Sequence, residues 1–345
     1  MLEFLVLRYE GIGRGRGSGA RRVLPSINER DNKMIKKQYN ILAENLKFPE
    51  GPIYMKDGSI ILVEIARGTL SKVIKGGKVE VVAHLGGGPN GAAIGPDGQC
   101  YVCNNGGFEW EINSKPAGMR PILQSKSYSG GKIQKVNLET GQFETLYEEC
   151  NGISLKGPND IVFDKEGNFW FTDLGKQRER DMDRGSIYWA KSDGSLIKEV
   201  IHPIMTPNGI GLSPDEKTLY VAETEGGKLY GFDIIGEGEI NKIQFPHSIN
   251  GGKLLNNEGG IKRFDSLAVE KNGNICVGTL FNGGISVISP SGDLVEFIKF
   301  EDPYITNICF GSKDLKTAYI TASYKGNLLE VKWDREGLPL NFLNK

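Results

Sequence analysis

The chain has 345 residues, and its 42 basic and 43 acidic side chains give a formal net charge of −1 at neutral pH. A charge so close to zero provides no global field that would attract nucleic acid or an anionic membrane surface. No apolar run approaches the roughly 18 residues that a membrane helix needs, and the segment LEFLVL lacks the basic leader and the length of a signal core. The composition therefore predicts a soluble, cytoplasmic protein with no nucleic-acid or membrane partner.

The first part of the chain has no hydrophobic period. Residues 11–22, GIGRGRGSGARR, are rich in Gly and Arg, which predicts a disordered tail over residues 1–36. An RNA-binding role is the alternative for this tract, although it has no interleaved aromatic residues. The ordered pattern begins near Met34, which is a candidate alternative start. Residues 37–345 are predicted to form a single domain.

Six stretches of the chain begin with a polar residue, run into an apolar strand, turn on Gly, Asp or Lys, and end in a second strand. Their first residues are separated by 40, 69, 49, 57 and 41 positions, about the length of a four-stranded propeller blade. We therefore predict an all-β fold, a six-bladed β-propeller whose site lies on the central channel. The six first residues are Glu50, Asn90, Asn159, Asn208, Asp265 and Thr306.

Regular strand signals follow each of these openings. Second strands are indicated by GNFWFTD, KTLYVAE, GNICVGT and TAYITAS, and third strands by GSIYWAK, GKLYGFD, GGISVIS and GNLLEVK. No long amphipathic helical pattern is present, which argues against Rossmann and α/β-barrel folds.

One long insertion interrupts the second repeat, at residues 105–129. Loops of this length in compact domains are usually functional or disordered. Because Phe108, Trp110, Met119 and Ile122 need a surface to bury against, we predict that the insertion covers one mouth of the channel as a substrate lid. A disordered loop is the alternative.

Cysteines and histidines give no sign of a zinc, disulfide or triad site. The five cysteines are scattered, and Cys100 and Cys103 are three positions apart on a predicted strand, so they point to opposite faces and are expected to pack in the core. His84, His202 and His247 fall in linker or outer-strand contexts, where packing or surface roles are expected.

The six openings predict a metal site, because their side chains should converge on one axis and five of them carry a carboxylate or amide oxygen. Calcium takes six or more oxygen ligands at about 2.3 to 2.6 Å. Glu50 and Asp265 would together contribute a charge of −2 that balances a divalent cation. Any single Asn-Gly or Asn-Asp pair is also typical of a turn. The recurrence in register favours ligands for Ca²⁺, with Zn²⁺, Mn²⁺ and Mg²⁺ as alternatives.

Several of these motifs resemble one known family, over about residues 41–342. The motifs are Glu50-Gly51-Pro52, Pro158-Asn159-Asp160, Pro207-Asn208-Gly209 followed by LSPDEKTLYVAET, and Phe264-Asp265-Ser266 with GNICVGT. Together they resemble the gluconolactonase/regucalcin family (SMP-30/gluconolactonase/LRE-like) of metal-dependent lactonases.

The resemblance implies roles for individual residues. Glu50, Asn208 and Asp265 would be metal ligands, with Asn159 as a further ligand or a substrate contact, and Asn90 and Asn104 would touch substrate. Asp265 followed by Ser266 is similar to the bacterial drug-responsive lactonases of the family, whereas a common family form has Pro-Asp-Gly there. Which lactone is the substrate stays open for that reason.

The activity that the resemblance implies is hydrolysis of a small lactone, a sugar lactone or related ester, by Lewis-acid catalysis. Asp265 is the first candidate for the base and Glu50 the second. Asp173 and Glu223 would lie farther from the ion and orient ligands or water, or else bond a neighbouring turn.

Two other functions remain open at this point. A propeller that binds calcium, and senses or scaffolds without catalysis, would share the fold, because propellers host both kinds of function. A propeller resembling strictosidine synthase would use a different acidic residue. The related paraoxonases are associated with a histidine pair near the metal, and no histidine of this chain has a matching position. The sequence leaves the oligomeric state open.

Overall fold

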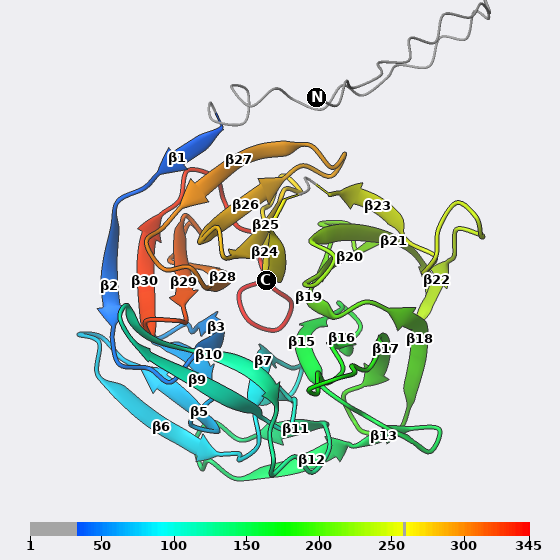
Figure 1. Ribbon diagram of the computed structural model, residues 1–345, viewed down its shortest axis with the longest axis horizontal. Helices are drawn as coiled ribbons and strands as arrows, with labels where there is room; N and C mark the ends of the chain where they lie inside the picture. The colour runs from blue at the N-terminus through cyan, green and yellow to red at the C-terminus, as the bar shows by residue number, and fades with distance from the viewer. Residues whose placement is uncertain (1–32, 258–259) are drawn as a thin grey trace, which may run out of the picture. The chain divides into compact units, whose positions relative to one another are not determined.

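The computed structural model describes residues 33–257 and 260–345, and this part of the chain is built from strands, turns and loops without an α-helix. Six sheets of four or five strands, antiparallel except for one pair of strands, follow one another around a central axis (Figure 1). The predicted six-bladed propeller is therefore confirmed. Nothing in the described ranges is a helix of the length and apolarity that crossing a bilayer requires.

Each blade is one sheet whose first strand lies at the channel. Blade 1 consists of β3 (Pro49–Tyr54), β4 (Ile60–Glu64), β5 (Thr69–Val73) and β6 (Val79–His84). Blade 2 consists of β7 (Pro89–Ile94), β8 (Cys100–Asn104), β11 (Lys132–Val136) and β12 (Phe143–Tyr147). Blade 3 consists of β15 (Pro158–Phe163), β16 (Asn168–Asp173), β17 (Gly185–Lys191) and β18 (Ile197–Ile204).

The other three blades are built in the same way, with additions at the outer edge. Blade 4 consists of β19 (Pro207–Leu212), β20 (Thr218–Glu223), β21 (Lys228–Gly236), β22 (Glu239–Asn241) and β23 (Lys253–Asn256). Blade 5 consists of β24 (Arg263–Val269), β25 (Ile275–Leu280), β26 (Gly284–Ile288), β27 (Leu294–Lys299) and β1 (Met34–Lys36). Blade 6 consists of β28 (Ile305–Gly311), β29 (Thr317–Ala322), β30 (Asn327–Lys332) and β2 (Tyr39–Ala43). Two short hairpins, β9 (Phe108–Ser114) with β10 (Ala117–Gln124) and β13 (Glu149–Cys150) with β14 (Ile153–Ser154), complete the strands.

The ring is closed by the N-terminal strands. Strand β2 pairs antiparallel with β30 in blade 6, and β1 pairs parallel with β27 in blade 5. The first strand thus begins at Met34, three residues before the predicted domain boundary at residue 37. Most of the predicted disordered tail, residues 1–32, lies outside the described residues.

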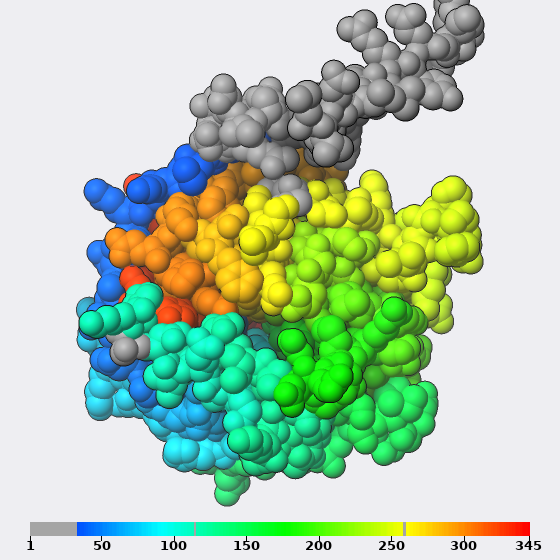
Figure 2. All heavy atoms as spheres, viewed as in Figure 1, coloured from blue at the N-terminus to red at the C-terminus, as the bar shows by residue number. Residues whose placement is uncertain are grey.

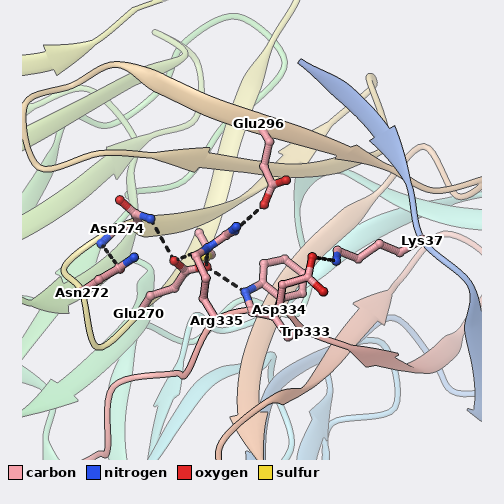
Figure 3. A network of polar contacts seen from close by, with 9 residues as sticks. Lys37, Glu270, Asn272, Asn274, Glu296, Trp333, Asp334 and Arg335 are labelled. Carbon is pink, nitrogen blue, oxygen red and sulfur yellow. Dashed lines mark hydrogen bonds and ion pairs between the residues drawn. The ribbon is translucent and has the colours of Figure 1, made fainter. Parts of the chain in front are cut away.

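A buried polar network strengthens the same closure (Figure 3). The Glu270 carboxylate, which is fully buried, accepts hydrogen bonds from Arg335 Nε at 2.6 Å and from Trp333 Nε1 at 2.7 Å. The Arg335 guanidinium also binds Glu296 of β27. Because Trp333 and Arg335 follow β30, these bonds fasten blade 6 to blade 5.

The inner strand of every blade has a register irregularity at its polar opening. Such bulges twist a strand locally and redirect its side chains. Asn90 and Asn208 therefore lie inside strands, and not in the turns that an Asn-Gly pair also favours. The glycines that follow have a steric reason: a Cβ on Gly51 would lie 2.8 Å from the Asn90 carbonyl oxygen, and one on Gly209 would lie 2.6 Å from that of Asp265. Adjacent inner strands thus meet backbone to backbone.

Apolar side chains fill the space between neighbouring blades. Cys100 packs in the cluster with Val63 of blade 1, whereas Cys103 packs in the cluster with Phe171 of blade 3. The two thiols therefore face opposite sides of blade 2, as predicted, and all five cysteines are buried and free.

Candidate metal and substrate site

The inner strands begin around a cavity of about 350 Å³ on the channel axis. Glu50, Asn90, Asn159, Asn208 and Asp265, from five different blades, all line it. Their positions at or near the start of β3, β7, β15, β19 and β24 bring them to the same end of the channel. The sixth opening residue, Thr306, is fully buried outside this wall and shares hydrogen bonds with Thr321 and Ser323.

Glu50 is a buried carboxylate held in place by amide donors. Its Oε2 accepts hydrogen bonds from Asn307 Nδ2 at 2.9 Å and from the Gly51 backbone N–H at 3.0 Å. Burial raises the pKa of Glu50 to about 7, although these hydrogen bonds act against the shift. The protein therefore orients this group while it disfavours its charge in the absence of a compensating cation.

Asp265 lies in a similar environment. Burial raises its pKa well above the usual range, and the nearby charge of Glu50 raises it further. Asn208 supports it with a hydrogen bond, and the Asn208 amide nitrogen also donates to Thr224 Oγ1 at 3.0 Å. Two buried carboxylates that repel each other are an arrangement that a divalent cation would stabilise.

Asn159 supplies the most specific observation at this site. It is 4% exposed, and its Oδ1 is buried with no hydrogen-bond partner in the described part of the chain. A buried amide oxygen left unpaired costs free energy unless something outside the polypeptide satisfies it. Two carboxylates and two amide oxygens form a hard donor set that suits Ca²⁺ or Mg²⁺. The residues present therefore fit a divalent cation.

The amide ligands are essential to that fit. Within residues 33–257 and 260–345, no three or more His, Cys, Asp or Glu side chains are grouped closely enough to hold a metal ion. No histidine is found among the described residues of the cavity wall. The candidate site thus depends on Asn159 and Asn208 as much as on Glu50 and Asp265.

Sequence reasoning missed a second set of polar residues, each of which directly follows an opening residue in the chain. Asp160, Ser266 and Asn307 occupy the positions that are Gly51, Gly91 and Gly209 in the other blades. Asn307 donates to Glu50, and Ser266 Oγ donates to Asn208 Oδ1 at 3.4 Å. Burial, followed by the charge of Glu50, raises the pKa of Asp160 to about 7. The departure from Gly in these three blades was the available sequence signal.

Three further residues that were predicted to lie near the site form hydrogen bonds with the backbone of their own blades. Asn104, Asp173 and Glu223 are each the last residue of a second strand, and each accepts a backbone N–H from the segment that leads into its own blade. The bonds are Gly88 N–H to Asn104 Oδ1 at 2.8 Å, Gly157 N–H to Asp173 Oδ1 at 2.6 Å and Met205 N–H to Glu223 Oε1 at 3.1 Å. Asn104 is not in the cavity wall, and its amide nitrogen donates to Gly86 and Gln134. Both polar atoms of the Asn104 amide are thus bonded to protein groups.

The insertion forms the β9–β10 hairpin, which crosses in front of blade 1 in Figure 1 and spreads over this face of the molecule in Figure 2. Its tip is bound to blade 6 through the Met119 N–H and the Tyr324 carbonyl, 3.0 Å apart. Its base is bound by Lys176, whose Nζ donates to the carbonyls of Asn105 and Gly107 at 2.8 Å each. Phe108 and residues 120–123 line the cavity. The β9–β10 hairpin thus forms a roof over the cavity that is held by hydrogen bonds at its tip and at its base.

The other end of the channel is closed by the C-terminal segment. A smaller cavity of about 110 Å³ is lined by Asp160, Asn307, later residues of the inner strands and Leu338–Asn341 with Lys345. In Figure 1 this segment forms a loop across the centre of the ring. Only the end beneath the hairpin therefore combines the polar openings with a larger cavity.

Comparison with known proteins assigns the family. The model of the SMP-30/Gluconolactonase/LRE-like region matches residues 48–324, and the chain belongs to this family, as predicted. It is 25% identical to a gluconolactonase from Zymomonas mobilis over 319 residues, which is 85% of this chain and 80% of that protein. It is 30% identical to the diisopropyl-fluorophosphatase of Loligo vulgaris over 212 residues, 57% of this chain and 64% of that one.

A solved structure supports the fold. The calcium-binding protein regucalcin from Agrobacterium tumefaciens superimposes with a TM-score of 0.68 at 17% identity, covering 89% of this chain and 98% of that chain.

Proposed function

We propose that this protein is a divalent-metal-dependent lactonase that opens a small lactone in the cavity beneath the β9–β10 hairpin. The unpaired, buried Oδ1 of Asn159 beside Glu50, Asn208 and Asp265 carries the proposal. The relatives named gluconolactonase and lactonase drp35 support the reaction class. Ca²⁺ is the first choice of cation, because the donor set is entirely oxygen.

Each residue of the site would have its own role in metal binding, proton transfer or substrate orientation. Glu50, Asn159, Asn208 and Asp265 would hold the cation, which when bound supplies Lewis acidity to the lactone carbonyl. Asp265 would accept the proton of the attacking water, with Glu50 as the second candidate for that role. Asn90 and the free face of Asn159 would orient the substrate by hydrogen bonds. The hairpin would exclude bulk water from the reacting group.

The experiment is hydrolysis of gluconolactone and a panel of other lactones by chelator-stripped protein, with and without Ca²⁺, Zn²⁺, Mn²⁺ or Mg²⁺. Turnover restored by a metal is the expected result. Tight metal binding without turnover of any lactone would contradict the proposal and favour a calcium-binding propeller that senses or scaffolds.

A further inference from the structure

The cavity is lined by basic as well as acidic side chains. Its wall contains three acidic residues, Glu50, Glu225 and Asp265, and three basic residues, Arg120, Lys176 and Arg263. A divalent cation bound by Glu50 and Asp265 would offset the negative charge of both carboxylates. Burial lowers the pKa of Lys176 to about 7, which leaves Arg120 and Arg263 as the basic wall residues that stay charged at neutral pH. With its two carboxylates bound to a cation, the cavity would therefore present these two arginines to an anionic ligand.

The two arginines reach one region of the wall from different elements. Arg120 comes from β10 of the hairpin and Arg263 from the start of β24. Both arginines lie close enough to Tyr304 to affect its pKa. Burial raises the pKa of this tyrosine, whereas a hydrogen bond from Arg120 and the charges of both guanidinium groups oppose the shift. The Arg263 guanidinium also lies 5.2 Å from the ring centroid of Phe281, another wall residue. The two positive groups thus flank the same stretch of wall.

Neither guanidinium is saturated by its protein partner. Arg120 binds Glu111 of β9 at 2.7 Å, and Arg263 binds Glu225 at 2.7 Å. A guanidinium carries five N–H donors, more than the contacts with Glu111, Tyr304 and Glu225 in the described part of the chain use, and these side chains are 40% and 39% exposed, so donors are available to a ligand in the cavity. Lys176 differs, because it is 2% exposed and its amino group already binds the hairpin backbone.

We propose that the substrate is an anionic lactone, one that carries a carboxylate or phosphate group in addition to the ring ester, and that Arg120 and Arg263 bind this group. The inference rests on the proposed lactonase function and narrows its substrate class. Guanidinium groups suit planar carboxylates and phosphates, with which they form charge-assisted and often bidentate bonds. Since Arg120 belongs to the hairpin, an anionic substrate would also help to hold the roof in place.

A matched pair of substrates tests the proposal. Glucarolactone differs from gluconolactone by a carboxylate in place of the terminal hydroxymethyl group. The metal-loaded enzyme should have a higher kcat/KM for glucarolactone, and the preference should decline as salt rises. Arg120→Gln and Arg263→Gln should each lower the ratio of the two kcat/KM values by about tenfold, whereas Glu225→Gln should raise it. Arg180→Gln is the matched control, because Arg180 is exposed and outside the cavity wall, and it should leave the ratio unchanged.

The outcomes separate this inference from the proposed function. Turnover of both lactones without a preference, or a ratio that neither arginine variant changes, would overturn the inference and leave the lactonase intact. If neither lactone is hydrolysed, calorimetry with open-chain glucarate decides the inference alone. Arginine-dependent binding of this dianion to metal-loaded protein would support the anion site, and its absence would overturn it.

Discussion

At the residue scale, the site gathers buried carboxylates and one amide oxygen, that of Asn159, which has no hydrogen-bond partner among the described residues. The carboxylates are those of Glu50, Asp160 and Asp265, whose pKa values are raised by burial. Burial shifts each of these carboxylates towards its neutral form, and the nearby charge of Glu50 adds to the shift for Asp160 and Asp265. A bound divalent cation would offset the cost of gathering them.

The variant Asp265→Asn tests this reading of the carboxylates. The amide keeps the shape and removes the cost of burying an acid that is ionised in the unfolded chain, so the metal-free variant should melt at a higher temperature than the metal-free wild type. The metal-induced rise in the melting temperature should shrink, and lactone turnover should fall by about a hundredfold or more. Thermal melts with and without Ca²⁺ measure both shifts. A lower melting point of the metal-free variant would contradict the account.

The sequence predicted these residues in part. The convergence of five of the six opening residues on one cavity could be predicted, because their register is visible in the sequence as a repeat. Asp160 was missed because a sequence does not reveal that a bulge brings two adjacent residues of β15 to the axis. The bonds of Asn104 to Gly88 and Gly106 were not predictable, because they depend on a loop conformation that no local pattern encodes.

At the scale of elements, the β9–β10 hairpin joins three blades over the cavity. Gly118 lies against Tyr324, where an added Cβ would approach the ring to 2.3 Å. Gly118→Val should therefore lift the hairpin tip and lower kcat/KM by about tenfold or more, because the roof positions substrate. Ile112→Ala is the control on the same hairpin, since Ile112 is 75% exposed. Unchanged kinetics and unchanged protease resistance of Gly118→Val would rule out a role for the roof.

Lys176 at the hairpin base should make stability depend on pH. Burial lowers its pKa from 10.5 to about 7, against the raising effect of Asp173 and Asp183. The unfolded chain then binds the proton more tightly, so the lysine destabilises the fold most below pH 7 and this cost disappears as the pH rises towards 10. Wild type should gain on the order of 3 kcal/mol over Lys176→Met across this window in urea unfolding. A difference that does not change with pH would contradict the burial argument.

Elements differed in how far the sequence revealed them. The inner and second strands are apolar, regular and bounded by Gly or Asp, so they were predicted almost as they are found. The pairing of β1 and β2 with blades 5 and 6 was not predicted, because MIK and YNILA are short, half-exposed strands whose partners lie at the far end of the chain.

At the scale of the whole molecule, the ring is stabilised where its two ends meet. Arg335 binds the fully buried Glu270 and thereby ties the segment after β30 to blade 5. Arg335→Met leaves that carboxylate without its cation and should lower the free energy of unfolding by about 3 kcal/mol. The double variant Glu270→Gln/Arg335→Met should recover part of the loss. A single variant as stable as wild type in urea unfolding would show that this closure contributes little.

The central claim is that one cation on the channel axis, held by Glu50, Asn159, Asn208 and Asp265, enables lactone hydrolysis. Titration of chelator-stripped protein with Ca²⁺, with bound metal and gluconolactone or glucarolactone turnover followed in the same sample, tests it most directly. The account predicts that turnover rises with occupancy and saturates at one ion per chain, and that Asn159→Ala requires at least about tenfold more Ca²⁺ to reach half of its maximal rate. Full turnover by the stripped protein, or unchanged metal affinity in Asn159→Ala, would contradict it.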